Sequence, residues 1–338
     1  MYSPIYIKEY YIYDIFHNDN NELIIISPIE NKPLEIKYKD EKFNVKICPH
    51  NHTYVYILNK KIRFKSIILL NIDGKDITTK VNKYPEFNDE IIMTTMVKNE
   101  DNIILQWIKF HHNIGIDRFI IYDNKGSDCC TKCKKNTDAE RKVLNNSNLK
   151  KLLNNYIEKG IVILIEWKYN KFMRKSGISG QSTQQNHSIW AFKNCKYIGL
   201  FDIDEYLNLQ HHKNIKSFFK DLIKKEEIKL KEIGSFIILN KFFYNPNNLP
   251  TDGFNFLKVY NCDKVTISKK SGREKNFVIP KNVDIYCIHK ILLGKKMINI
   301  SESDLFFNHY CYLNKVNRGK KITNLIDNSI NKHIKKFI

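Results

Sequence analysis

The sequence lacks any long apolar run. No segment approaches the roughly 20 consecutive apolar residues that a helix needs to cross a bilayer. The first residues, Met1–Tyr10, also lack the basic and then apolar pattern of a secretory signal. We therefore expect no transmembrane segment and a cytoplasmic protein that is either soluble or held on membranes only by partners.

Clustered cysteines are scarce as well. The 338 residues include eight cysteines, of which only Cys129, Cys130 and Cys133 lie close together. A four-ligand zinc site usually needs a second C-x-x-C pair, and none is present. We expect reduced thiols, as in cytosolic proteins, and a local disulfide or a partial metal site in this loop is the alternative.

Acidic residues are few in comparison with basic ones, since 36 Asp and Glu stand against 56 Lys and Arg, a net charge of +20. Such an excess first suggests a nucleic acid or another anionic surface as a partner. The lysines are scattered, however, among abundant Asn and Ile, which is typical of compositional bias, and no Arg-rich stripe or nucleic-acid-binding motif occurs. We expect no nucleic-acid partner, although a basic surface would attract nucleotide-sugar phosphates or acidic glycans.

The first part of the sequence contains short apolar segments separated by Pro, Asn and Asp-Gly. Their spacing predicts a small sandwich or barrel over residues 1–88, an all-β accessory domain. The expected strands are Leu23–Ser27, Leu34–Tyr38, Phe43–Ile47, Tyr54–Leu58 and Ile67–Leu70. His50 and His52 lie in a turn of this region, where an isolated pair is more often structural than metal-binding.

From residue 89 onward the predicted strands alternate with helices, the pattern of an α/β domain with a mostly parallel sheet. Ile91–Val97 and Arg118–Asp123 are predicted strands. Asp101 is expected to cap the helix between them, which ends at Gly115. We predict that residues 89–338 form this second, larger domain.

Polar side chains follow both of these strands where each one ends. Lys98, Asn99 and Glu100 come after the first, and Asp123 and Asn124 close the second. The carboxyl ends of parallel strands meet at one edge of a sheet, where α/β proteins bind their ligands. These residues are therefore predicted to contact the base and ribose of a nucleotide.

A buried strand followed by acids organises the second domain. The segment from Tyr197 to Phe201 is apolar, and Asp202, Asp204 and Glu205 come directly after it. Side chains alternate along a strand, so Asp202 and Asp204 are expected to share a face. Two such carboxylates predict a divalent cation that keeps positions open for substrate phosphates.

Four further segments are candidates for the same site. His309 follows two aromatic residues, and a distant imidazole commonly completes a two-carboxylate metal site, so a buried structural role and a ligand role are equally favoured. Gln184–His187 is either a solvated helix face or a contact for the acceptor or sugar. Asp252 is the only acid of a loop that would wall the acceptor site, and the basic stretch Arg174–Gln181 would close over phosphates.

The ordered motifs resemble the glycosyltransferase family 92 domain, also called DUF23, over about residues 90 to 320. They are Met96–Glu100, Trp107–Gly115, Phe119–Asn124, Phe201–Tyr206, Pro280–Val283 and Asn308–Tyr310. The resemblance implies a GT-A fold, which is Rossmann-like, for residues 89–338. It also implies a UDP-sugar donor, typically UDP-galactose, with Mn²⁺ (or Mg²⁺), inversion at the anomeric carbon, and a glycan or glycoprotein acceptor.

The resemblance also assigns residues by position. Lys98, Asn99, Glu100, Asp123 and Asn124 would line the nucleotide pocket. Asp202 and Asp204 would hold the diphosphate and its metal, with His309 as a further metal ligand. The chain departs from the family pattern in three places: Tyr206 stands where Phe is usual, Asn186–His187 where Asn-Asp is usual, and Asn314–Lys315 where Lys-Ser is usual.

The predicted reaction is a metal-dependent sugar transfer in which the cation neutralises the departing diphosphate. The acceptor hydroxyl needs a base, for which Glu205 and Asp252 are both candidates. Two alternatives stay open: a non-catalytic nucleotide- or glycan-binding protein on a transferase fold, and a nucleic-acid binder or metal nuclease that uses the positive charge.

Overall fold

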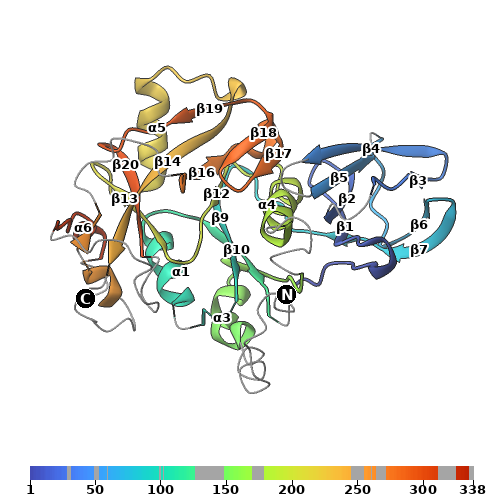
Figure 1. Ribbon diagram of the computed structural model, residues 1–338, viewed down its shortest axis with the longest axis horizontal. Helices are drawn as coiled ribbons and strands as arrows, with labels where there is room; N and C mark the ends of the chain where they lie inside the picture. The colour runs from blue at the N-terminus through green and yellow to red at the C-terminus, as the bar shows by residue number, and fades with distance from the viewer. Residues whose placement is uncertain are drawn as a thin grey trace.

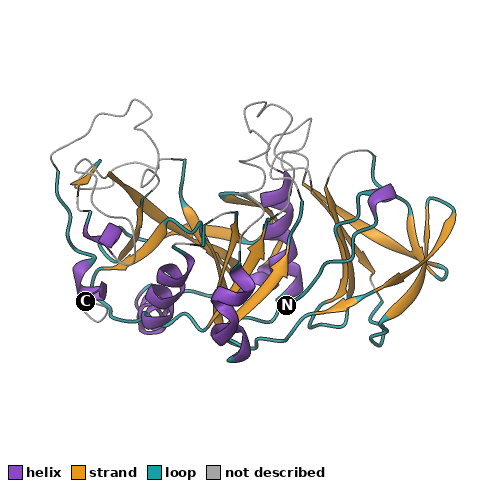
Figure 2. Cartoon of the chain, turned by 90° about the horizontal axis from the view of Figure 1, so that it is seen from below, coloured by secondary structure: helices purple, strands orange, loops and turns teal. Residues whose placement is uncertain are grey.

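The computed structural model describes residues 1–28, 32–48, 53–58, 60–98, 100–101, 103–125, 148–169, 179–244, 255–259, 261–263, 272–310 and 325–334. Two large sheets dominate this part of the chain. They follow one another along the long axis of the molecule, with helix α4 (Ser179–Ala191) between them (Figure 1, Figure 2).

The first sheet is built entirely from the first 83 residues. Its strand order is β7-β6-β3-β4-β5-β2-β1-β8, and its pairs are antiparallel except that β8 runs parallel to β1. The five predicted strands of this region are confirmed, and β1, β7 and β8 are additional. The bounds are β1 (Asp14–His17), β2 (Leu23–Pro28), β3 (Ile36–Tyr38), β4 (Glu41–Cys48), β5 (Thr53–Leu58), β6 (Ile67–Ile72), β7 (Lys75–Lys80) and β8 (Asn82–Lys83).

The larger sheet is parallel in one half and mixed in the other. Its order is β11-β10-β9-β12-β16-β14-β20-β13, with β15 and β19 also paired to β14. Strands β11, β10, β9 and β12 are parallel to one another, whereas β16 is antiparallel to both β12 and β14. The expectation of a mostly parallel sheet thus describes only the first half. The bounds are β9 (Ile91–Val97), β10 (Arg118–Asp123), β11 (Val162–Glu166), β12 (Tyr197–Leu200), β13 (Glu205–Leu209), β14 (Ile233–Tyr244), β15 (Asn261–Cys262), β16 (Lys275–Val278), β19 (Lys296–Asn299) and β20 (Leu305–His309).

Successive residues of the parallel strands pack into two different cores. Met93 and Ile121 belong to the core that contains helices α1 (Ile104–Asn113), α3 (Leu149–Glu158) and α5 (Ile215–Lys225). Ile92 and Ile120 belong to a second core, formed with α4, the first sheet and the hairpin of β17 (Val283–Cys287) and β18 (Lys290–Gly294). A strand that is buried on both faces must be apolar throughout, which explains why these segments showed no polar alternation.

Strand β2 has the same double role in the first sheet. All six of its residues are buried. Ile24 and Ile26 pack in the second core with α4, whereas Leu23 and Ile25 pack in a third core inside the first sheet. The first sheet therefore covers one face of the larger structure through a continuous apolar contact, and the division into domains at residue 88 stays a prediction.

A buried carboxylate reinforces this contact. Asp14 is fully buried, and its Oδ2 accepts hydrogen bonds from the Tyr84 hydroxyl at 2.6 Å and from Nε2 of His187 on α4 at 2.9 Å. Its Oδ1 accepts two backbone N–H groups at 2.8 Å. A carboxylate only accepts, so the Nε2 of His187 carries a proton, and its Nδ1 lies 2.7 Å from the hydroxyl of Tyr122, with which it shares a hydrogen bond. The network links β1, α4 and β10.

The predicted cap of α1 is wrong. The helix begins after Ile103, with no side-chain hydrogen bond at its first turn. Asp101 instead accepts a hydrogen bond from the backbone N–H of Asn148 at 2.8 Å, at the start of α3. The predicted end is confirmed, because the helix stops at Asn113 and Gly115 follows with a φ of +100°.

Asp14→Asn should destabilise the whole chain. The amide nitrogen that replaces one carboxylate oxygen is a donor, so it leaves buried donors facing it without an acceptor, at a cost of about 3 kcal/mol. The measurement is urea unfolding followed by fluorescence and by circular dichroism, with coincident transitions expected for sheets that share a core. The control is Asp221→Asn, whose carboxylate is 61% exposed and which should change the free energy of unfolding by less than about 0.5 kcal/mol. Equal stability of the two variants would contradict this role of Asp14.

Candidate metal and nucleotide site

The candidate site forms where the chain passes from β12 to β13. Strand β12 ends at Leu200, and after a short turn the chain becomes β13 at Glu205. The alternation of strand side chains used in the sequence analysis therefore does not extend to Asp202 and Asp204. Strand β13 pairs antiparallel with β20 in a register that sets Glu205 opposite His309. Neither of these two strands was predicted from the sequence.

Three potential metal ligands meet at this pairing. One ligand atom from each of Asp204, Glu205 and His309 lies within 4.8 Å of the other two. The Nε2 of His309 is 3.6 Å from Asp204 Oδ2, and its Nδ1 is 3.7 Å from Glu205 Oε1. Both Glu205 Oε1 and His309 Nδ1 are buried without a hydrogen-bond partner in the described part of the chain. We refer to these three residues as the acidic cluster.

A lysine that the sequence analysis missed compensates the neighbouring acids. Lys275, on β16, places its ammonium 2.6 Å from Asp202 Oδ2 and 3.2 Å from Glu205 Oε2. The backbone N–H of Asp202 also donates to Glu205 Oε2 at 2.8 Å. Gln181 of α4 donates to the other Asp202 oxygen at 3.2 Å. Asp202 is thus ion-paired to a protein cation, and its predicted place among the metal ligands stays a prediction.

The charges of the site do not cancel. The described residues of the site include three carboxylates, on Asp202, Asp204 and Glu205, and one ammonium, on Lys275, which gives a net charge of −2 when all three carboxylates are ionised and His309 is neutral. Burial raises the pKa of Glu205 to about 7, with the neighbouring acids adding to it and Lys275 and His309 opposing it. For His309 and Lys275, burial disfavours the charged form, but the adjacent carboxylates outweigh it and raise both pKa values.

Helix α1 holds β13 in place from behind. The indole N–H of Trp107 donates to the Glu205 carbonyl at 3.0 Å. One turn later, His111 donates from Nδ1 to the Trp107 carbonyl at 2.9 Å and accepts the Leu207 N–H at Nε2, 3.3 Å away. These two contacts fix a neutral tautomer, and burial lowers the pKa of His111 to about 3. The motif Trp107-x-x-x-His111 is therefore a support for the strand that carries Glu205.

The predicted nucleotide contacts lie at the ends of β9 and β10. Lys98, Glu100 and Asp123 are partly exposed there, and burial raises the pKa of Asp123. Asn124 is buried, and both hydrogens of its amide are donated to backbone carbonyls, those of Trp167 at 2.6 Å and Tyr169 at 2.7 Å. Asn124 therefore ties the end of β10 to the segment after β11, and the nucleotide roles of all four residues stay predictions.

The segment Gln184–His187 is not a solvated helix face. All four residues are buried on α4. Gln184 donates to Thr94 Oγ1 at 2.9 Å, and Asn186 exchanges hydrogen bonds of 2.9 Å with the backbone of Tyr286. Of the two alternatives, the solvated face is wrong because α4 is covered by the first sheet on one side and by β17 on the other, and the contact with an acceptor or sugar stays a prediction.

Several predicted features lie outside the described residues. They are Asn99, Asp252, His50, His52, the cysteine cluster Cys129–Cys133 and most of the basic stretch from Arg174. None of the described helices combines the length and the apolar character needed to cross a bilayer.

Comparisons with known proteins identify the relatives of this chain. A family model described as "Glycosyltransferase family 92" matches residues 145–337, so the match begins later than the motifs near residue 90 suggested. A glycosyltransferase family 92 protein of Ricinus communis is 23% identical over 231 residues, which are 66% of this chain and 35% of the relative. Another, of Oryza sativa subsp. japonica, is 23% identical over 223 residues, 64% of this chain and 32% of the relative. The chain spans about a third of the length of these curated relatives.

Solved structures also show a likeness to this chain. Apo UDP-glucose pyrophosphorylase covers 66% of this chain and 90% of its own at 9% identity, with a TM-score of 0.26. A score this low carries no argument about fold or ligand.

His111→Gln should reduce the dependence of stability on pH. The unfolded chain binds a proton at His111 below about pH 6.5, whereas the folded protein excludes it down to about pH 3. The free energy of unfolding therefore falls as the pH falls through this window, by about 1.4 kcal/mol per pH unit for one proton. Urea titrations at several pH values between about 6 and 4 should show a wild-type slope that exceeds the variant's by this amount. Equal slopes would mean that His111 is protonated in the folded protein.

Lys275→Met should cost about 3 kcal/mol of stability, because it leaves the buried Glu205 carboxylate without its cation. The matched change Lys224→Met removes an exposed ammonium on α5 and should cost less than about 0.5 kcal/mol. Both variants are unfolded in urea with a chelator present, so that no metal ion replaces the lost charge. If the two variants unfold at the same urea concentration, the ion pair with Glu205 does not contribute as described.

Proposed function

The chain belongs to glycosyltransferase family 92, and on that premise we propose that it is a GT-A glycosyltransferase. It moves a hexose from a nucleotide sugar to a glycan or glycoconjugate acceptor. The observation that carries the proposal is the register of β13 and β20, which brings His309 against Glu205 and beside Asp204. The family membership supports the reaction class, and the acidic cluster supports a place for its cation.

The acidic cluster fits a divalent cation in three respects. Together with the neighbouring Asp202 and Lys275, it has three carboxylates and one ammonium, and the charge of −2 that they carry when ionised is matched by an ion of charge +2. Two of its buried ligand atoms, on Glu205 and His309, have no other hydrogen-bond partner in the described residues. Carboxylate oxygens suit Mn²⁺ and Mg²⁺, and an imidazole ligand favours the transition metal, so Mn²⁺ is the proposed ion.

We propose a different role for each residue of the site. Asp204, Glu205 and His309 would hold the cation, which when bound neutralises the charge that develops on the leaving diphosphate. Lys275 occupies the second oxygen of Glu205 and so leaves the first directed at His309. The side chain of Asp202 is 43% exposed, and we propose it as a contact for the donor.

We propose Asp252 as the base that accepts the proton of the acceptor hydroxyl. Glu205, the other candidate, is completely buried, with Lys275 at one oxygen and His309 at the other. A base must reach the acceptor proton directly or through one water, which this burial opposes. The donor is proposed to be UDP-galactose and the reaction to proceed with inversion, as the family resemblance implies, with Lys98, Asn99, Glu100 and Asp123 around the nucleotide.

Asp204→Asn should fold normally and lose function. Removing one charged ligand should weaken Mn²⁺ binding by more than about 100-fold, beyond the range seen when only an outer partner of a ligand is changed. Mn²⁺-dependent UDP binding, measured by calorimetry, and turnover of UDP-galactose should be lost with it. The control is Asp304→Asn, in the turn before β20 and outside the acidic cluster.

Three outcomes separate the hypotheses. Unchanged turnover in Asp204→Asn would refute the metal assignment. UDP binding without any turnover in the wild-type chain would favour the non-catalytic binding protein. Steeply salt-dependent binding of DNA or RNA, with no response to UDP, would favour the nucleic-acid binder.

A further inference from the structure

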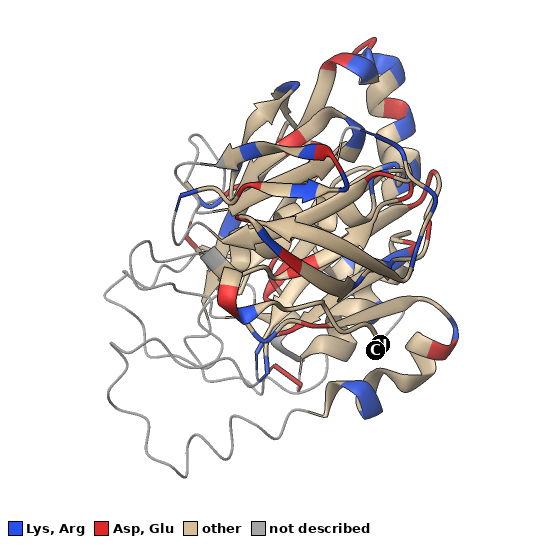
Figure 3. Ribbon diagram, turned by 90° about the vertical axis from the view of Figure 1, so that its right-hand side faces the viewer, with Lys and Arg blue, Asp and Glu red and all other residues tan. Residues whose placement is uncertain are grey.

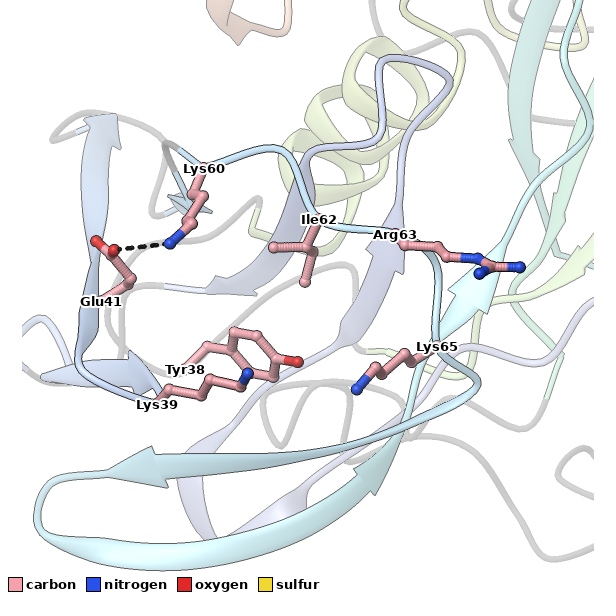
Figure 4. A pocket seen from close by; sticks show the side chains of 7 residues that line it. All are labelled: Tyr38, Lys39, Glu41, Lys60, Ile62, Arg63 and Lys65. Carbon is pink, nitrogen blue, oxygen red and sulfur yellow. Dashed lines mark hydrogen bonds and ion pairs between the residues drawn. The ribbon is translucent and has the colours of Figure 1, made fainter.

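A hollow in the first sheet concentrates positive charge (Figure 4). It lies between the turn that joins β3 to β4 and the connection from β5 to β6, and its volume is about 220 Å³. The residues that line it are Tyr38, Lys39, Glu41, Lys60, Ile62, Arg63 and Lys65. We refer to it as the basic hollow; it belongs to the first sheet, whereas the acidic cluster belongs to the larger one.

The cations of the basic hollow are not balanced by acids. Lys60 pairs with Glu41, the hollow's only acid, at 3.3 Å. For Lys39, Arg63 and Lys65 the described part of the chain shows no carboxylate within ion-pair distance. Three uncompensated cations around one concavity repel each other, and this repulsion is relieved by a bound anion.

Several other exposed lysines of the same sheet form ion pairs with acidic side chains. Lys37 and Lys42 both pair with Glu35, at 3.2 Å and 3.0 Å, and Lys75 lies 3.4 Å from Glu9. Basic and acidic positions are accordingly interspersed over this end of the molecule (Figure 3). The basic hollow differs from these positions, since three of its cations have no such acid among the described residues.

One of these cations, Lys39, has an unfavourable backbone conformation. Lys39 has a φ of +54° in the two-residue turn between Tyr38 and Glu41. Gly or Asn adopts this left-handed conformation with less strain than a residue with a long side chain. A lysine there is unfavourable for the turn itself.

The floor of the hollow is apolar. Tyr38 is 9% exposed, and Ile62 packs against the core of the first sheet. The Lys39 ammonium lies 5.9 Å from the centre of the Tyr38 ring, and the Lys39 and Lys65 side chains both extend toward Tyr38 (Figure 4). A ligand that fills the hollow must therefore offer an anionic group to the rim and an apolar surface to the floor.

From this combination we infer that the basic hollow binds a phosphate or sulfate ester carried by a sugar. The oxyanion pairs with Lys39 and Lys65, and the C–H face of the sugar ring covers Ile62, which is partly exposed. The volume equals that of roughly seven liquid waters, which exceeds the space a bare oxyanion needs. The inference concerns binding at the first sheet and goes beyond the proposed transfer reaction.

Two other anionic partners fit the hollow less well. Nucleic-acid strands bind by stacking bases on exposed aromatic rings, whereas Tyr38 is almost completely covered. A membrane surface needs apolar side chains beside the cations, and the exposed aliphatic residues of β6, Ile67 and Leu69, do not line the hollow.

The test compares the double variant Lys39→Asn/Lys65→Gln with Lys220→Gln/Lys224→Gln, which removes the same charge from exposed positions on α5. The probes are glucose 6-sulfate, glucose 6-phosphate, glucose and inorganic phosphate, titrated by calorimetry at constant ionic strength. The esters should bind the wild-type and control proteins and should bind the double variant at least about tenfold more weakly, because two charge-assisted contacts are lost. Glucose should not bind.

A thermal melt excludes unfolding as the cause of lost binding. Lys39→Asn alone should keep or raise the melting temperature, because Asn tolerates the positive φ of this turn, while it weakens ester binding. Asp204→Asn should keep ester binding, which separates the hollow from the catalytic proposal.

The inference is overturned if the esters bind the double variant as tightly as the wild type or bind neither protein. It is equally overturned if inorganic phosphate binds as tightly as the esters, since the sugar then contributes nothing. Binding of a single-stranded oligonucleotide or of phosphatidylserine vesicles that the double variant abolishes, without ester binding, would assign the hollow to those partners instead.

Discussion

The pairing of β13 with β20 is the constraint on which the candidate site depends. It joins segments that lie about a hundred residues apart in the chain and sets Glu205 directly opposite His309. Side chains alternate along a strand, so a slip of one residue would turn His309 away from Glu205 and disperse the acidic cluster. Buried amides oppose such a slip, since Asn208 donates to Asn308 at 3.1 Å and to Ser329 at 2.9 Å. The ligand set is therefore a product of strand register.

The electrostatics of the site follow from that register. Bringing Glu205 into the interior costs free energy unless a cation accompanies it. Lys275 provides one positive charge from the neighbouring β16 and shares it between Glu205 and Asp202. The remaining negative charge lies on the side of Asp204 and His309, where the site is partly exposed. The fold thus neutralises the buried side of the cluster and leaves the open side for a ligand.

Local sequence patterns were sufficient to predict part of this arrangement. The sequence alone predicts β9, β10 and β12 and the acids after β12. These features are local, because a strand and its end lie within a few residues of each other. The rest depends on contacts between distant segments. Lys275 looks like any other lysine of a basic sequence until β16 places it beside Asp202. Asp101 was predicted to cap α1, but its carboxylate accepts a hydrogen bond at the start of α3 instead. His187 resembled a residue of a polar helix face, but its partner Asp14 lies 173 positions away.

The central claim is that Asp204, Glu205 and His309 hold one divalent cation. Its most direct test is anomalous X-ray diffraction from crystals of the chain grown with MnCl₂ and UDP, recorded at the manganese absorption edge. The account predicts a single strong anomalous peak within bonding distance of all three side chains, with the UDP phosphates on its open side. A peak elsewhere, or none at these residues in crystals that contain bound UDP, would contradict it.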